Sequence, residues 1–184
     1  MDQKLEAATL AGGCFWCTEA IFKRLKGVEK VTSGYSGGKQ ENPSYEEVSS
    51  GDTGHAESIQ IEFDPSIIPY EKILEIFFHL HDPTTKNRQG NDVGEQYRSM
   101  IFYHSLYQKS AAEKVKQEVE KEGKYKDPIV TEIIPYDAFY SAEGYHQNYY
   151  ENNQNQGYCS FIITPKIQKL LREYTKEVKE EYLS

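Results

Sequence analysis

The chain has 184 residues, 38% of them hydrophobic and 27% charged, so it is long enough to bury a sizeable core as a single soluble domain spanning residues 1–184. Its formal net charge of -8 argues against a nucleic-acid-binding protein, which normally presents a basic face. The longest apolar run is too short to span a bilayer, and the three cysteines fit a cytosolic thiol chemistry better than a secreted disulfide framework.

The chain starts with Met1–Glu6, which has neither a basic segment nor an apolar core, so we expect no signal peptide and a cytoplasmic location. Apolar residues then alternate or recur at helical spacing between segments rich in turn residues. The predicted strands cover residues 4–11, 28–35, 55–63, 96–104 and 129–134. The predicted helices cover residues 15–26, 69–80, 105–121, 141–150 and 165–181. Two irregular connections remain, 39–54 and 82–95, and loops as long as the first are usually functional or disordered.

The first six predicted elements follow the order strand, helix, strand, strand, helix, strand. This order predicts an α+β fold, a two-layer split βαβ (ferredoxin-like) sandwich with helices on one face of a mainly antiparallel sheet. The C-terminal elements would extend or wrap this sandwich. No internal repeat or linker marks a second domain.

The clearest predicted strand carries a carboxylate near its start. Ile59, Ile61 and Phe63 alternate with polar residues, as in a half-buried strand, and Glu57 has the same parity. Glu57 should therefore point to the apolar side, where partial desolvation would raise its pKa. The alternative is that the strand begins at Ser58 and that Glu57 is a solvated loop residue.

Cys14 lies in the segment Gly-Gly-Cys-Phe-Trp-Cys, between a glycine pair and a predicted helix. The glycines permit a tight turn and leave the thiol sterically open. We expect Cys14 in the first helical turn, where unpaired N–H groups and the helix dipole would lower its pKa from about 8.5 to ~5–7. Phe15 and Trp16 add an aromatic wall suited to a small apolar group such as a methyl.

The Cys14-x-x-Cys17 pair permits three hypotheses. A structural zinc site would need Cys159 and His146 as further ligands. A thioredoxin-like disulfide exchanger would also place such a pair after a strand and at the start of a helix, but normally with other residues between the cysteines. In the third hypothesis Cys14 is a nucleophile. A thiolate, an apolar wall and a carboxylic acid are compatible with reduction of a sulfoxide, although they do not prove it. Acyl transfer, with His55 or His146 as the general base, is an alternative.

A series of motifs between residues 10 and 159 resembles the methionine sulfoxide reductase A family in order and spacing. The matching segments are Gly13–Trp16 with Thr18 and Glu19, Gly34–Gly38, Asn42–Tyr45, Gly54–Glu57, His81–Thr84, Asn87–Ser99, Tyr145–Gln147 and Gly157–Cys159. The resemblance implies an enzyme that reduces methionine S-sulfoxide, free or in oxidised proteins, to methionine. It also implies that the enzyme uses no organic cofactor and no metal.

The resemblance further implies a role for each residue of the site. Cys14 would attack the sulfoxide sulfur, and Glu57 would protonate the departing oxygen. Tyr45 and Tyr97 would bind that oxygen, and Phe15 and Trp16 would bind the S-methyl group. Asp92 would belong to the nearby hydrogen-bond network.

After methionine leaves, the resemblance implies that Cys14 remains as a sulfenic acid and that a second cysteine converts it to a disulfide, which thioredoxin reduces. Some members use a cysteine in Gly-Tyr-Cys for this step and others use the position of Cys17, and this chain has both. We favour Cys159, because residues 152–157 are rich in turn formers and cysteines at i and i+3 of a regular helix bridge only with distortion. Cys17 would be the alternative resolver, a relay, or a small buried helix residue. We expect a monomer that binds neither nucleic acid nor a membrane.

Overall fold

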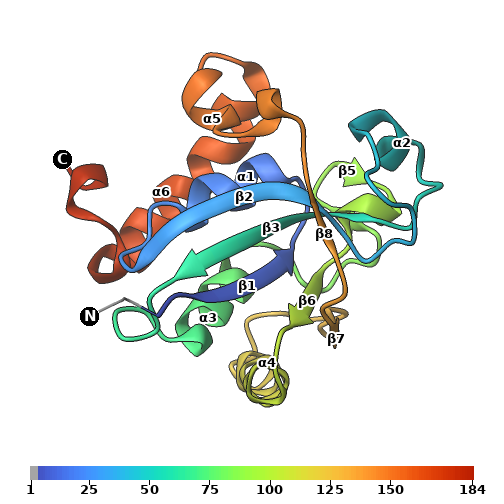
Figure 1. Ribbon diagram of the computed structural model, residues 1–184. Coiled ribbons are helices and arrows are strands. Elements are labelled where there is room, and N and C mark those ends of the chain that lie inside the picture. The colour runs from blue at the N-terminus through green and yellow to red at the C-terminus, as the bar shows by residue number, and fades with distance from the viewer. Residues whose placement is uncertain (1–3) are drawn as a thin grey trace.

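A six-stranded sheet forms the centre of the computed structural model, which describes residues 4–184 (Figure 1). The prediction that the chain starts without a signal peptide partly concerns residues 1–3, which lie outside this range. In spatial order the strands are β7 (Glu132–Pro135), β6 (Met100–Tyr103), β1 (Glu6–Ala11), β3 (Ala56–Phe63), β2 (Val28–Ser36) and β8 (Phe139–Ser141). The β6–β7 pair is parallel, whereas the other pairs of this sheet are antiparallel. The fold is therefore a mixed α and β architecture around a mixed, curled sheet.

The apolar residues that alternate with polar ones along β3 are buried, as the sequence predicts. Ile59, Ile61 and Phe63 are fully buried in the main core. The predicted parity of Glu57 is also confirmed, because β3 begins at Ala56 and Glu57 is 2% exposed. The alternative, in which Glu57 is a solvated loop residue, is wrong.

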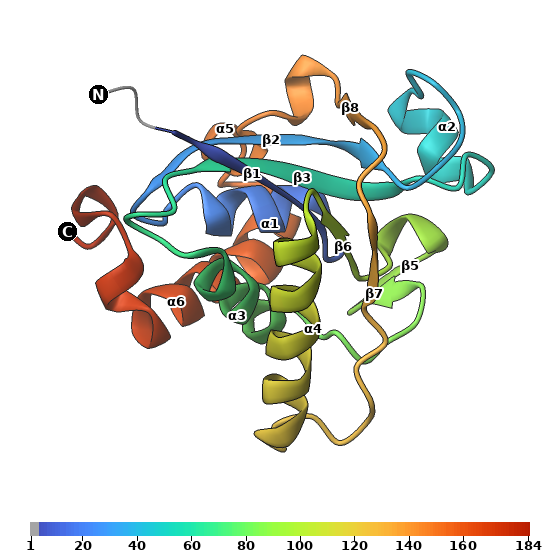
Figure 2. The same ribbon diagram turned by 60° about the horizontal axis from the view of Figure 1, so that its bottom comes forward.

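Four helices lie on one side of the sheet, below it in the view of Figure 2. They are α1 (Phe15–Phe22), α3 (Tyr70–Leu80), α4 (Leu106–Lys121) and α6 (Thr164–Glu173). Each contributes buried apolar residues to the main core, such as Phe22 from α1 and Leu170 from α6. This layer fixes α1 against β2 and β3, so the first residue of α1 lies close to the start of β3.

Both irregular connections contain short elements that the sequence analysis did not predict. Within 39–54, helix α2 (Tyr45–Ser50) begins at a capping box, in which the Ser44 hydroxyl accepts from the Glu47 amide and the Glu47 carboxylate accepts from the Ser44 amide. Within 82–95 a small hairpin forms, and its strands are β4 (Arg88–Gln89) and β5 (Asp92–Val93).

Several predicted elements differ from the observed ones. The helix predicted over 15–26 ends at Phe22, and the strand predicted over 129–134 lies at Glu132–Pro135. The strand predicted over 96–104 is shorter, because Glu95–Tyr97 forms a 3-10 turn before β6. The helix predicted over 141–150 is wrong. In its place the structure has β8, the 3-10 turn Gly144–His146 and the helix α5 (Tyr149–Asn152).

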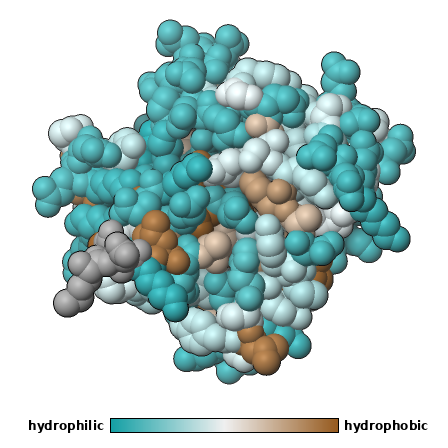
Figure 3. Space-filling model, viewed as in Figure 1, coloured by the Kyte–Doolittle hydropathy of each residue, from teal (hydrophilic) through white to brown (hydrophobic). Residues whose placement is uncertain are grey.

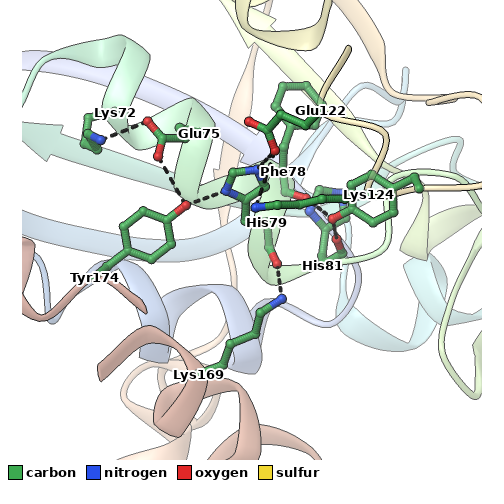
Figure 4. A network of polar contacts seen from close by, with 10 residues as sticks. Lys72, Glu75, Phe78, His79, His81, Glu122, Lys124, Lys169 and Tyr174 are labelled. Carbon is green, nitrogen blue, oxygen red and sulfur yellow. Dashed lines mark hydrogen bonds and ion pairs between the residues drawn. The ribbon is translucent and has the colours of Figure 1, made fainter. Parts of the chain in front are cut away.

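The C-terminal helix α6 ends at Glu173 rather than near 181, because the next residues are held by other parts of the chain. The Tyr174 hydroxyl bonds to His79 of α3, whose other ring nitrogen lies 2.9 Å from the Glu122 carboxylate (Figure 4). Val178 then pairs with Leu25 just after α1 and is fully buried. These contacts fasten the C-terminal segment to the helix layer.

The face of the molecule in Figure 3 is mostly hydrophilic, with small separate apolar patches. Within residues 4–184, no helix is both long and apolar enough to cross a membrane.

Candidate active site

Cys14 lies immediately before α1, in the turn that the glycine pair makes possible. Gly13 has a φ of +90°, and a Cβ there would come within 2.6 Å of the Gln89 side chain, so glycine is required at this position. Cys14 is the N-cap residue of α1, with an extended backbone (φ -61°, ψ 126°). The prediction that Cys14 belongs to the first helical turn is therefore corrected, since the helix begins one residue later.

The prediction that Cys14 has a lowered pKa is also wrong. Its side chain is 8% exposed, and burial raises the pKa of this thiol well above its usual value. The neighbouring Cys17 sulfur and Glu57 carboxylate raise it further, because a second negative charge beside either group is unfavourable. These effects outweigh the hydrogen bond from the Trp16 amide, which favours the thiolate.

Cys17 is the more acidic of the two neighbouring thiols. The hydrogen bond from Cys14 lowers the pKa of Cys17 to about 7, against the opposing effect of burial, and the Lys166 ammonium also favours the Cys17 thiolate. Two adjacent buried sulfurs cannot both ionise easily. Because burial raises its pKa, Cys14 keeps its proton in the unliganded site.

Glu57 is fixed next to Cys14 by a backbone contact. Its Oε2 accepts a 3.0 Å hydrogen bond from the Phe15 amide at the start of α1. Burial raises the pKa of Glu57 to about 8, and the nearby charge of Asp92 contributes to the rise. At neutral pH Glu57 is thus mostly a protonated acid, which is the form that can donate a proton.

Tyr45 and Tyr97 reach the same space from α2 and from the 3-10 turn before β6. Burial raises the pKa of both hydroxyls, and so do the charges of Glu57 and Cys14. Both hydroxyls therefore stay protonated at neutral pH, as hydrogen-bond donors close to the thiol and the acid.

Phe15 and Trp16 form an aromatic wall with two residues that the sequence analysis did not assign to the site. The Trp16 ring stacks on Tyr149 of α5, with ring centroids 3.6 Å apart and an interplanar angle of 5°. The Trp16 Nε1–H donates a 3.0 Å hydrogen bond to Nδ1 of His146. The Phe15 ring is fully buried beside His146 and stacks on Tyr45, with centroids 6.5 Å apart.

His146 is a buried neutral residue of this wall. Burial lowers its pKa, and because Nδ1 accepts from Trp16, the proton lies on Nε2. Nε2 has no hydrogen-bond partner within the part of the chain that the structure describes. The only signal for His146 in the sequence was the Tyr-His-Gln motif, where we considered it as a zinc ligand or an acyl-transfer base.

Asp92 comes from the hairpin that the sequence analysis missed. Its carboxylate accepts a 2.6 Å hydrogen bond from the Tyr158 hydroxyl, whose oxygen lies 3.8 Å from Sγ of Cys17. Tyr158 precedes a π-helical turn, Cys159–Ile163, that leads into α6. The hairpin and the C-terminal elements thus meet over the start of α1.

Cys159 opens this π-helical turn and is fully buried. It belongs to the same apolar cluster as Cys14 and Cys17, and all three cysteines are free thiols. Burial and the nearby Cys17 charge raise its pKa. Cys159 is therefore held in a helical turn beside Cys17, whereas we had expected it to follow a loose segment.

The structure thus brings all nine predicted site residues into one region. They are Cys14, Phe15, Trp16, Cys17, Tyr45, Glu57, Tyr97, Asp92 and Cys159. Within residues 4–184 no group of three or more His, Cys, Asp or Glu side chains is arranged to hold a metal ion, so the zinc set considered above is not assembled.

Comparison with known proteins identifies close relatives. The family model described as peptide methionine sulfoxide reductase matches residues 6–179. A protein from Sulfolobus acidocaldarius, named peptide methionine sulfoxide reductase MsrA, is 56% identical over 170 residues, which cover 92% of this chain and 96% of that protein. The crystal structure of reduced Mxr1 from Saccharomyces cerevisiae is similar, with a TM-score of 0.80, 36% identity and coverage of 86% of this chain and 91% of that one. The structure of Mxr1 in complex with Trx2 matches with a TM-score of 0.58, 28% identity and coverage of 81% and 87%.

Proposed function

The chain belongs to the peptide methionine sulfoxide reductase family, oxidoreductases that reduce methionine sulfoxide with a thiol, and from this premise we propose how its own residues carry out the reaction. Cys14 takes the oxygen from methionine S-sulfoxide, free or within proteins, and becomes a sulfenic acid. The observation that carries the proposal is Glu57, a buried acid held by the Phe15 amide next to the Cys14 thiol.

In the first step the Cys14 sulfur attacks the sulfoxide sulfur while Glu57 gives its proton to the sulfoxide oxygen. The oxygen passes to Sγ, the substrate leaves as methionine, and Cys14 remains as a sulfenic acid. The substrate sulfur gains two electrons and Sγ loses two. The pKa of about 8 supports this role for Glu57, because an ordinary glutamic acid would be ionised at neutral pH.

The remaining site residues position the substrate. Tyr45 and Tyr97 donate hydrogen bonds to the sulfoxide oxygen, and their raised pKa values support the donor role. Phe15 and Trp16 receive the S-methyl group, since their rings form the apolar side of the site. Asp92 acts through Tyr158 and keeps that residue beside the thiols.

Cys14 is activated by its substrate. The free thiol is protonated because burial disfavours its charged form, and because ionisation of Cys17 or Glu57 beside it would make a charge on Sγ still less favourable. A bound sulfoxide presents a positively polarised sulfur to Sγ, which favours the thiolate at the moment of attack. Cys17, already hydrogen-bonded to Cys14, is the neighbour able to receive the displaced proton.

For the second step we now favour Cys17 over Cys159 as the first resolver. The objection to Cys17 was the strain of an i, i+3 bridge on a regular helix, and Cys14 is extended rather than helical. Cys17 passes the proton that it received from Cys14 to the Glu57 carboxylate and attacks the sulfenic sulfur. An S–S bond forms, the S–O bond breaks, and the hydroxyl takes the proton from Glu57 and leaves as water. Cys159, buried next to Cys17, can then exchange into the disulfide.

Thioredoxin is the proposed reductant of the final disulfide, since the similar Mxr1 forms a complex with Trx2. The enzyme needs no other cofactor in this scheme. We also propose that residues 1–184 act as one domain and as a monomer in the cytoplasm. The strand order β6-β1-β3-β2, with helices on one face, supports the split βαβ description of the core.

The direct test is turnover of the two separated methionine sulfoxide epimers with thioredoxin, its reductase and NADPH. We expect turnover of the S epimer only, and none by Cys14→Ser. Turnover of the S epimer by Cys14→Ser would refute the assignment of the nucleophile.

A further inference from the structure

Cys14 opens into a groove that extends well beyond the reacting thiol. The groove has a volume of about 490 Å³. One wall is the β4–β5 hairpin, from Gln89 to Asp92, and the other runs from Tyr158 to Lys166 through the π-helical turn and the start of α6. Pockets of roughly 300–1,000 Å³ hold ligands of drug size, so the groove is larger than one methionine side chain requires.

The wall on the α6 side is apolar and unusually exposed. Phe161 is 81% exposed, although its ring lines the same groove as Cys14. Ile162 and Pro165 continue this wall. An exposed apolar surface that is continuous with a reactive thiol indicates that a ligand covers it when the site is in use.

The same wall carries a positive charge. The half-buried Lys166 lines the groove, and its ammonium makes no hydrogen bond or ion pair with any other residue of 4–184. The carboxylate on the opposite wall, Asp92, already accepts from Tyr158. Lys166 is therefore the one cation among the residues that line the groove, in a chain whose net charge is -8.

We propose that this groove binds the residues that flank methionine sulfoxide in an oxidised polypeptide, and that it favours an apolar neighbour on Phe161 and an acidic neighbour on Lys166. The proposal rests on the proposed reductase activity and adds a preference among its protein substrates. A polypeptide continues on both sides of the sulfoxide side chain, so its neighbouring residues must lie along the walls next to Cys14. Burial of an apolar side chain against Phe161 and charge attraction to Lys166 then give the preference.

The test compares blocked tripeptides with methionine S-sulfoxide in the middle, in single turnovers without any reductant. The flanking residues are leucine and glutamate, leucine and lysine, or glycine on both sides. We expect the second-order rate constant of the single turnover to be several-fold higher with glutamate than with lysine, and about tenfold higher with leucine and glutamate than with two glycines. Because no reductant is present, docking of thioredoxin cannot produce these differences.

Variants then assign the preference to the groove. Lys166→Glu should reverse the order of the glutamate and lysine peptides, and Phe161→Ser should bring the leucine and glycine peptides close together. Each ratio is measured within one variant, so a general loss of activity does not affect it. Arg172→Glu makes the same charge change on the exposed face of α6, outside the groove, and should leave the ratios as in the parent.

The possible failures are distinct. If the parent reduces free methionine sulfoxide but shows no flank preference, or if Lys166→Glu and Arg172→Glu change the ratios equally, the groove proposal is wrong and the reductase assignment stands. If Phe161→Ser changes only the dependence on thioredoxin concentration in full turnover, the apolar wall serves the reductant and the proposal is also wrong. If the parent does not reduce free methionine sulfoxide, the proposed function itself fails.

Discussion

The Phe15 amide donates a 3.0 Å hydrogen bond to Oε2 of Glu57, a residue 42 positions further along the chain. Phe15 follows Cys14 directly and begins α1, whereas Glu57 is the second residue of β3. One backbone bond therefore fixes the distance between the thiol and the buried acid.

Replacement of Glu57 by glutamine should slow the oxygen-transfer step by about 10²–10⁴, because the amide keeps the acceptor oxygen for Phe15 but cannot donate an acidic proton. Rapid-quench measurement of methionine formed in one turnover gives this rate. Glu19→Gln is the matched control, since Glu19 is also a buried acid on α1 whose pKa is raised by burial, but it bonds to the Asn148 amide away from the thiol. An unchanged rate in Glu57→Gln would remove Glu57 as the acid.

The stability of the protein should also report the raised pKa of Glu57. A carboxyl whose pKa rises from about 4.5 to about 8 on folding favours the folded state below pH 4.5, and this contribution is lost as the pH rises through 8. Between pH 5 and pH 9 the parent should therefore lose up to about 4 kcal/mol of unfolding free energy relative to Glu57→Gln. Urea denaturation of both proteins at the two pH values measures the difference. The same difference in unfolding free energy between the two proteins at both pH values would contradict the assigned pKa.

The order of the two resolving cysteines can be read from thiol counts after one turnover without reductant. In Cys159→Ser we expect the Cys14–Cys17 disulfide to form, which leaves no free thiol. In Cys17→Ser we expect Cys14 to remain as a sulfenic acid and Cys159 as the single free thiol, because Cys159 is buried beside Cys17. Rapid formation of a Cys14–Cys159 disulfide in Cys17→Ser would restore Cys159 as the first resolver.

His146→Phe should loosen Trp16, since it removes the acceptor of the indole N–H and keeps an aromatic ring in the same place. We expect KM for methionine sulfoxide to rise several-fold, with a smaller effect on the single-turnover rate at saturation. Trp16 is the only tryptophan of the chain, so its fluorescence follows the same change directly. An unchanged spectrum together with an unchanged KM would show that the bond does not position the ring.

The sequence predicted the site well where local pattern and tertiary packing agree. The period-two pattern of 55–63 placed Glu57 on the buried side, and the family motifs pointed to residues that the fold brings together. The pKa of Cys14 was predicted with the wrong sign. Its burial comes from the hairpin at 88–93 and the turn at 158–163, which are distant in sequence, and local reasoning included only the helix dipole.

Some of the elements that were not predicted depend on local sequence, and others depend on contacts between distant parts of the chain. Helix α2 could have been predicted, because Ser44 and Glu47 have the spacing of a capping box. The end of α6 could not, since Tyr174 leaves the helix to bond with His79, a residue 95 positions earlier. The π-helical turn that holds Cys159 likewise carries no signal that we can identify in the sequence.

The most direct test of the account is the fate of the sulfoxide oxygen in the double variant Cys17→Ser/Cys159→Ser, which keeps Cys14 and removes both resolving thiols. The variant is mixed with excess methionine S-sulfoxide without reductant, and methionine and the modified peptide are quantified by mass spectrometry. We expect one equivalent of methionine per enzyme and one added oxygen atom, trapped as a sulfenic acid on the peptide that carries Cys14. Formation of methionine with no oxygen on Cys14 would contradict the account.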